Sequence, residues 1–99
     1  MTTQRGTLSA DHKIPGGKLL RVRLTLGGPA GSPMIQSIHI TGDFFMHPEE
    51  AIESLEAMLT GAPFAEDAVR ERVRSFFSGE VEVIGADVEG VVTAIMKVS

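Results

Sequence analysis

The segment GKLLRVRLTL at residues 17–26 alternates apolar and polar side chains, and this alternation constrains the fold more than any other feature. The apolar set is Leu20, Val22, Leu24 and Leu26, and the polar set between its members is Arg21, Arg23 and Thr25. A period of two predicts a strand with one buried face and one exposed face. The rest of the chain must therefore supply a layer that covers the apolar face.

A second strand is predicted at residues 34–42, MIQSIHITG, after a Gly- and Pro-rich turn at residues 27–33. Its two predicted faces are Met34, Ile38 and Ile40 on one side and Ser37, His39 and Thr41 on the other. Two strands joined by a short loop most simply form an antiparallel hairpin. Gly42 is expected to let the chain leave the sheet sharply.

Helices are predicted after the hairpin. The first has Pro48 at its first position, an apolar stripe through residues 51–59, and Gly61 just past its end. A second helix is predicted over residues 65–77, and residues 78–85 form either a connection or a brief third strand. Residues 86–98 are rich in Val and Ile, which favour strands, but their apolar spacing is helical, so we favour a helix capped by Asp87.

This order of elements predicts an α+β fold, with a small antiparallel sheet and helices packed on one of its faces. The sheet consists of the hairpin and a possible third strand. Residues 1–10 are polar and small, and we expect a flexible lead-in there, with one domain over residues 11–99. A chain of 99 residues with 42% hydrophobic content supports a single core.

Composition excludes several classes of function. The chain has no cysteine, which rules out disulfides, thiolate metal sites and persulfide chemistry, and its net charge of -4 argues against nucleic acid as a partner. His12, His39 and His47 are too widely spaced to predict a metal site. We find no membrane span and no signal-like stretch, and therefore expect a cytoplasmic location.

The first candidate site is HKIPGGKL, at residues 12–19. Its proposed members, Lys13, Gly16, Gly17 and Lys18, combine flexible backbone with two ammonium groups. Such a loop allows backbone N–H groups to approach a phosphate. A plain turn before a strand uses the same residues, and both interpretations stay open.

The second candidate site is the turn GDFF, at residues 42–45. Adjacent side chains in extended backbone point in different directions, so we expect one of Phe44 and Phe45 to cover the core. The other is exposed or anchors an interface, and core packing of both is the alternative. Asp43 is expected to cap backbone N–H groups of this turn, with a metal or substrate contact as the alternative.

No catalytic constellation is visible in the sequence. Four acidic residues of the first helix, Glu49, Glu50, Glu53 and Glu56, fit a solvated helix face better than a pair of catalytic carboxylates. No Ser/His/Asp arrangement has suitable spacing. We therefore expect a chain that is not catalytic on its own.

The two candidate segments together resemble the C-terminal accessory domain of lipoate-protein ligase A. In that family a K-x-P-G-G-K-L strand entry precedes a strand that ends in G-D-F-F, and the next helix ends in L-x-G. The resemblance is close over residues 11–61. It implies a fold similar to the sulfur acceptors and iron–sulfur scaffolds, whose thiolate chemistry the missing cysteine excludes here.

Since the large catalytic domain of that family is missing, the resemblance implies the stand-alone small subunit of a two-part, archaeal-type ligase. It implies ATP, Mg2+ and lipoate at the complex, with none bound by this chain alone. It further implies that the lipoyl group of lipoyl-AMP is transferred to a lysine on lipoyl domains of 2-oxoacid dehydrogenases or on the glycine-cleavage H protein. Lys13, Gly16, Gly17 and Lys18 would face the nucleotide, and Phe44 or Phe45, presented by Asp43, would dock the catalytic chain.

A different class of function remains open from the sequence. The chain can instead be a stand-alone ligand-binding or regulatory module that shares the fold but has no ligase partner. Stable association with a catalytic chain distinguishes the two hypotheses.

Overall fold

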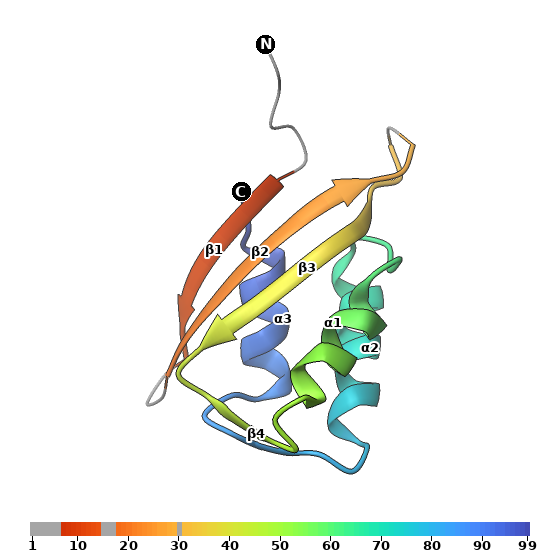
Figure 1. Ribbon diagram of the computed structural model, residues 1–99. Coiled ribbons are helices and arrows are strands. Elements are labelled where there is room, and N and C mark those ends of the chain that lie inside the picture. The colour runs from red at the N-terminus through yellow and green to blue at the C-terminus, as the bar shows by residue number, and fades with distance from the viewer. Residues whose placement is uncertain (1–6, 15–17, 30) are drawn as a thin grey trace.

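A computed structural model describes residues 7–14, 18–29 and 31–99, arranged as a three-stranded antiparallel sheet covered by helices on one face (Figure 1). The sheet strands, in spatial order, are β1 (Thr7–Lys13), β2 (Leu19–Gly27) and β3 (Met34–Gly42). The helices are α1 (Ala51–Leu59), α2 (Glu66–Phe77) and α3 (Val88–Met96). Two short strands, β4 (Phe45–His47) and β5 (Glu82–Ile84), form a separate antiparallel ribbon. The predicted α+β class is confirmed.

The third strand of the main sheet comes from the N-terminal segment. β1 begins at Thr7, so the flexible lead-in predicted through residue 10 is wrong for residues 7–10, and residues 1–6 lie outside the described part. Leu8 and Ala10 of β1 lie opposite Leu24 and Val22 of β2 and are half-buried. Residues 82–84, the predicted candidate for a third strand, pair with β4 instead.

A bulge changes which residues of β3 face the core. The register shifts between Thr25 and Leu26, which pair with Ser37 and Ile35, so Gln36 has no partner on β2. The extra residue reverses the alternation. Ile35 is therefore fully buried. Met34, which was expected to face the core, is only half-buried.

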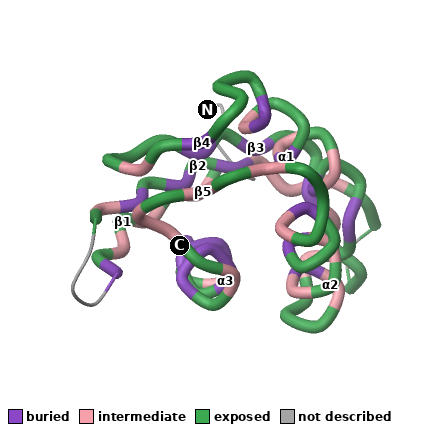
Figure 2. Tube along the Cα trace, turned by 90° about the horizontal axis from the view of Figure 1, so that it is seen from below, coloured by how far each residue is buried: buried purple, intermediate pink, exposed green. Residues whose placement is uncertain are grey.

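The core lies between the sheet and the helices, and buried residues line that space (Figure 2). Fully buried side chains come from every major layer, among them Leu20, Ile35, Leu55, Val73 and Ile95. No polar or charged residue is buried in the part of the chain that the structure describes. Burial of apolar surface therefore supplies the main stabilisation.

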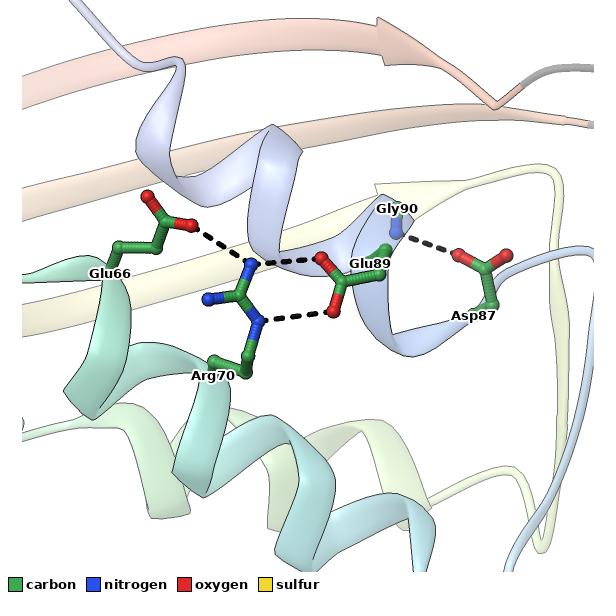
Figure 3. Close-up of polar contacts among 5 residues, drawn as sticks. All are labelled: Glu66, Arg70, Asp87, Glu89 and Gly90. Carbon is green, nitrogen blue, oxygen red and sulfur yellow. Dashed lines mark hydrogen bonds and ion pairs between the residues drawn. The ribbon is translucent and has the colours of Figure 1, made fainter.

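The helix boundaries follow the predicted signals, with one difference. Pro48 is not the first helical residue, because α1 begins at Ala51, whose N–H donates to the Pro48 carbonyl over 3.0 Å. The predicted C-terminal helix is confirmed as α3. The Asp87 carboxylate caps it by accepting a hydrogen bond from the Gly90 N–H at 2.7 Å (Figure 3).

A single guanidinium joins the two helices that follow α1. Arg70 of α2 donates to Glu66 one turn earlier and to both carboxylate oxygens of Glu89 on α3, over 2.9 to 3.0 Å (Figure 3). Hydrogen bonding from Arg70 lowers the pKa of Glu89 below its ordinary range. This contact fixes α3 relative to α2 on the covered face of the sheet.

Candidate functional site

The two candidate segments lie together at one end of the sheet. The N–H of Ile14 donates to the carbonyl of Lys18 at 3.0 Å, which closes the loop between β1 and β2. The N–H of Asp43 donates to the carbonyl of Leu19 at 3.1 Å, which ties the turn after β3 to the start of β2. The loop with the two lysines and the turn with the two phenylalanines are therefore neighbours. Gly16 and Gly17 lie outside the described residues.

Gly85, which the sequence analysis did not single out, packs against both segments. A Cβ at this position would lie 2.8 Å from Cγ of Lys18 and 3.3 Å from Cα of Phe44. The backbone of Gly85 has a φ of 96°, which disfavours a side chain there in any case. The segment after β5 therefore fills the space between Lys18 and Phe44.

The beginning of α3 supports the same end of the molecule. A Cβ at Gly90 would lie 2.9 Å from Cδ1 of Ile14, so this turn of the helix approaches the β1–β2 loop closely. The cap by Asp87 already uses the Gly90 N–H. The helix start is thus a structural support for the loop.

Lys13 and Lys18 are both exposed, on either side of the β1–β2 loop. Neither ammonium group takes part in the ion pairs found among residues 7–14, 18–29 and 31–99.

Asp43 does not act as the predicted cap. Its side chain is exposed, and no hydrogen bond to its carboxylate is found within the described segments. The backbone holds the turn instead, through the Asp43 N–H and through close contact at Gly42, where a Cβ would overlap the carbonyl oxygen of Leu19.

The two phenylalanines point to different environments. Phe44 is half-buried and packs against the core, whereas Phe45 is 71% exposed. Phe45 pairs across the ribbon with Ile84, which is 60% exposed. These two are the large hydrophobic residues that stand exposed in the described part of the chain, and we call them the Phe45–Ile84 pair.

A hollow of about 380 Å³ adjoins this pair, between the end of β3, β4 and α1. Its walls include Phe44, Phe45 and Ile52. Nearby, the carboxylate of Glu56 on α1 accepts a hydrogen bond from the Ile40 N–H at 2.9 Å. The Glu56 carboxylate therefore satisfies a backbone N–H on the outer edge of β3. The prediction that Glu56 belongs to a solvated helix face is wrong.

The described residues offer neither a cluster of metal-ligating side chains nor a candidate membrane-spanning helix. They contain no group of three or more His, Asp or Glu side chains arranged to hold a metal ion. They also include no helix long and apolar enough to cross a membrane.

Most of the chain matches a known protein family. Residues 7–94 match the family model of the bacterial lipoate protein ligase C-terminus. The chain belongs to this family. The match extends the resemblance seen over residues 11–61 to the start of β1, to α2 and to most of α3.

A curated relative supports the same assignment. Lipoate-protein ligase A subunit 2 of Thermoplasma acidophilum is 38% identical over 77 residues, which are 78% of this chain and 76% of that protein. A solved structure agrees. One chain from an archaeal lipoylation system, described as a bi-partite lipoate protein ligase and its E2 lipoyl domain from Thermoplasma acidophilum, superposes with a TM-score of 0.75. It shares 36% identity, and the match covers 90% of this chain and 93% of that one.

Within this lipoate-ligase family domain, the sequence reasoning missed Ile84 and Gly85. Both lie in residues 78–85, for which the sequence predicts either a connection or a brief strand. A period of two that places Val81 and Val83 inward puts Ile84 on the outward face beside Glu82, and this signal could have identified it. The pairing of β5 with β4, which places Ile84 beside Phe45, is a long-range contact that no local signal in the sequence specifies.

Proposed function

We propose that this chain is the accessory subunit of a two-part lipoate-protein ligase, which binds a separate catalytic chain and enables the adenylation of lipoate. The family membership and the name of the relative, a ligase subunit 2, support this assignment. The bi-partite organisation of the similar archaeal system supports it further. Location in the cytoplasm, where such a ligase would meet its acceptors, is part of the proposal.

The observation that carries the docking role is the exposed Phe45–Ile84 pair. Two large apolar side chains on one face of a short ribbon lose contact with water when a partner covers them. Aromatic anchors at the centre of an interface commonly contribute most of the binding energy. Phe44 holds the ribbon against the core from the other side, so the anchor is presented on a fixed support.

The neighbouring loop would act on the nucleotide. Lys13 and Lys18 would place positive charge near the phosphates at the partner's site, and the backbone at Gly16 and Gly17 would allow a close approach. Closure of a second subunit over that site would also exclude water from the labile mixed anhydride. ATP, Mg2+ and lipoate are bound by the complex rather than by this chain alone.

In the proposed reaction, the lipoate carboxylate attacks the α-phosphorus of ATP and pyrophosphate leaves, which gives lipoyl-AMP. An acceptor lysine then attacks the acyl carbon and AMP leaves. The acceptors are lipoyl domains of 2-oxoacid dehydrogenases or the glycine-cleavage H protein. This chain contributes positioning and electrostatic stabilisation to the first step.

The test is lipoate-dependent exchange of pyrophosphate into ATP. The candidate catalytic chain is assayed with and without this protein, and this protein is assayed alone. We expect exchange in the mixture at a rate far above either chain by itself. Equal exchange by the catalytic chain in the absence of this protein would refute the accessory role.

A further inference from the structure

All three helices cover one face of the sheet, so the other face is open (Figure 1). Cross-strand pairing sets two adjacent rows on this face. One row is Asp11, Arg21 and Thr41, and the next is Ser9, Arg23 and His39. All six side chains are exposed. We call these six residues the open face.

The open face carries two arginines and one aspartate, a formal charge of +1, in a chain whose net charge is -4. Residues 1–27 contain five of the nine Lys and Arg side chains but one of the thirteen Asp and Glu side chains. The remaining residues therefore carry nearly all of the negative charge. The open face therefore differs in the sign of its charge from the chain as a whole.

One of the two arginines of this face has no charged partner in the described segments. Arg21 donates to Asp11 at 2.9 Å, in an ion pair where both side chains are exposed. Arg23 takes part in none of the ion pairs or side-chain hydrogen bonds found in the described segments, and it lies directly opposite the imidazole of His39. Arg23 is thus the group on this face whose donors are free for another molecule.

These side chains border a single hollow. Arg21, Arg23, His39 and Thr41 surround a depression of about 370 Å³. The free guanidinium of Arg23 presents a planar fork of donors, which matches a carboxylate in bidentate geometry, while Arg21 beside it is already paired with Asp11. Thr41 also borders the hollow beside Phe45, so the open face is continuous with the proposed docking site.

We infer that the open face is the second half of the docking surface and receives a carboxylate-rich surface of the catalytic chain. This inference rests on the proposed function and deepens it, because it specifies the chemistry of the partner's surface. An acidic protein surface fits better than nucleic acid. The net charge of -4 opposes long-range attraction of a phosphate backbone, whereas a discrete carboxylate can be paired at short range by Arg23.

The test measures the affinity of the catalytic chain for three forms of this protein at low and high salt. The forms are the unmodified protein, Arg23→Glu and Arg74→Glu. Arg23→Glu reverses one charge on the open face. Arg74→Glu is the matched control, because Arg74 is exposed on α2 in the helix layer and the change in net charge is the same. At about 0.05 M NaCl we expect Arg23→Glu to weaken association roughly tenfold or more, and Arg74→Glu by less than about twofold. At about 0.5 M NaCl the difference should shrink.

The outcomes separate this inference from the proposed function. Absence of any complex with the unmodified protein would refute both. A complex that Arg23→Glu and Arg74→Glu weaken equally, or that neither weakens, would refute the inference alone. If the unmodified protein instead forms a dimer that Arg23→Glu dissociates, the open face binds a second copy and the inference is wrong. Arg23→Gln, which removes the charge without adding a carboxylate, carries the test if Arg23→Glu does not fold.

Discussion

Phe45 and Ile84 lie directly opposite each other in the β4–β5 ribbon, and both side chains face solvent. A two-stranded ribbon is marginally stable by itself. Here the ribbon is held in place because Met46 of β4 and Phe44, the residue before β4, pack against the core. The core thus stabilises the ribbon from one side while the apolar pair is left available to a partner on the other.

The Phe45–Ile84 pair predicts a separation of binding from stability. Phe45→Ala and Ile84→Ala should each change the free energy of unfolding by less than about 0.5 kcal/mol, because neither side chain is buried. Phe45→Ala should weaken association with the catalytic chain by about 2 kcal/mol or more, as expected for an aromatic anchor. Urea unfolding and calorimetric titration measure the two quantities.

Phe44→Ala is the matched comparison for that experiment. The Phe44 ring is half-buried against the core, so its loss should lower the free energy of unfolding by about 2 kcal/mol, roughly half the cost of a fully buried ring. If Phe45→Ala and Phe44→Ala both lower stability and leave association unchanged, the docking role of this ribbon is refuted.

Lys18→Ala should reduce lipoate-dependent exchange in the mixed complex without unfolding the chain. The ammonium group is exposed, and its loss would remove one donor near the nucleotide, so a decrease of about tenfold or more is expected. Arg74→Ala provides the control, because Arg74 is exposed on α2 in the helix layer. Equal exchange activity of the two variants would refute the nucleotide role of Lys18 and leave the β1–β2 loop as a plain turn.

Much of the fold was predictable because its signals are local. The alternation from Leu20 to Leu24 identified β2, and Asp87 with the spacing of the following apolar residues identified α3. The shift of phase at Ile35 was not predictable, because the bulge is a property of the pairing with β2 and not of β3 alone.

The candidate site was predictable to a smaller extent. The close approach of Lys18 to the Phe44 turn follows from strand pairing, which joins segments far apart in the sequence. β1 was missed because Leu8 is the one large apolar residue at its inward positions, which otherwise hold Ala10 and His12. Ile84 was missed because nothing local in residues 78–85 specifies β4 as its partner.

Gly42→Ala should destabilise the fold through a backbone overlap. A Cβ at this position would collide with the carbonyl oxygen of Leu19, which cannot move without disturbing the β2–β3 pairing. We expect a loss of about 1–3 kcal/mol in the free energy of unfolding, measured in urea. Gly79→Ala is the control, since a Cβ there would make an ordinary contact of 3.4 Å with the Phe76 carbonyl. Similar stability of both variants would contradict the overlap.

Asp87→Ala should lower stability by about 1 kcal/mol, because it leaves the Gly90 N–H at the start of α3 without its acceptor. Asp87→Asn should retain most of the stability, since the amide oxygen can accept the same hydrogen bond. Thermal unfolding of the two variants and the unmodified chain tests this. An equal loss for Asn and Ala would show that the carboxylate charge, and not the cap, matters.

Arg70→Gln should lower stability in a pH-dependent manner. The guanidinium lowers the pKa of Glu89 in the folded chain below its ordinary value of 4.5. In the unfolded chain Glu89 regains that ordinary value, so on acidification the unfolded state binds the proton first. The stabilisation is therefore fully present above pH 4.5, and it is lost as the pH falls through the lowered pKa of the folded state. The urea midpoints of the unmodified chain and of Arg70→Gln should differ most at neutral pH and converge on acidification. A difference that stays constant down to the acid limit would show that Arg70 stabilises the helix pair by packing and not through Glu89.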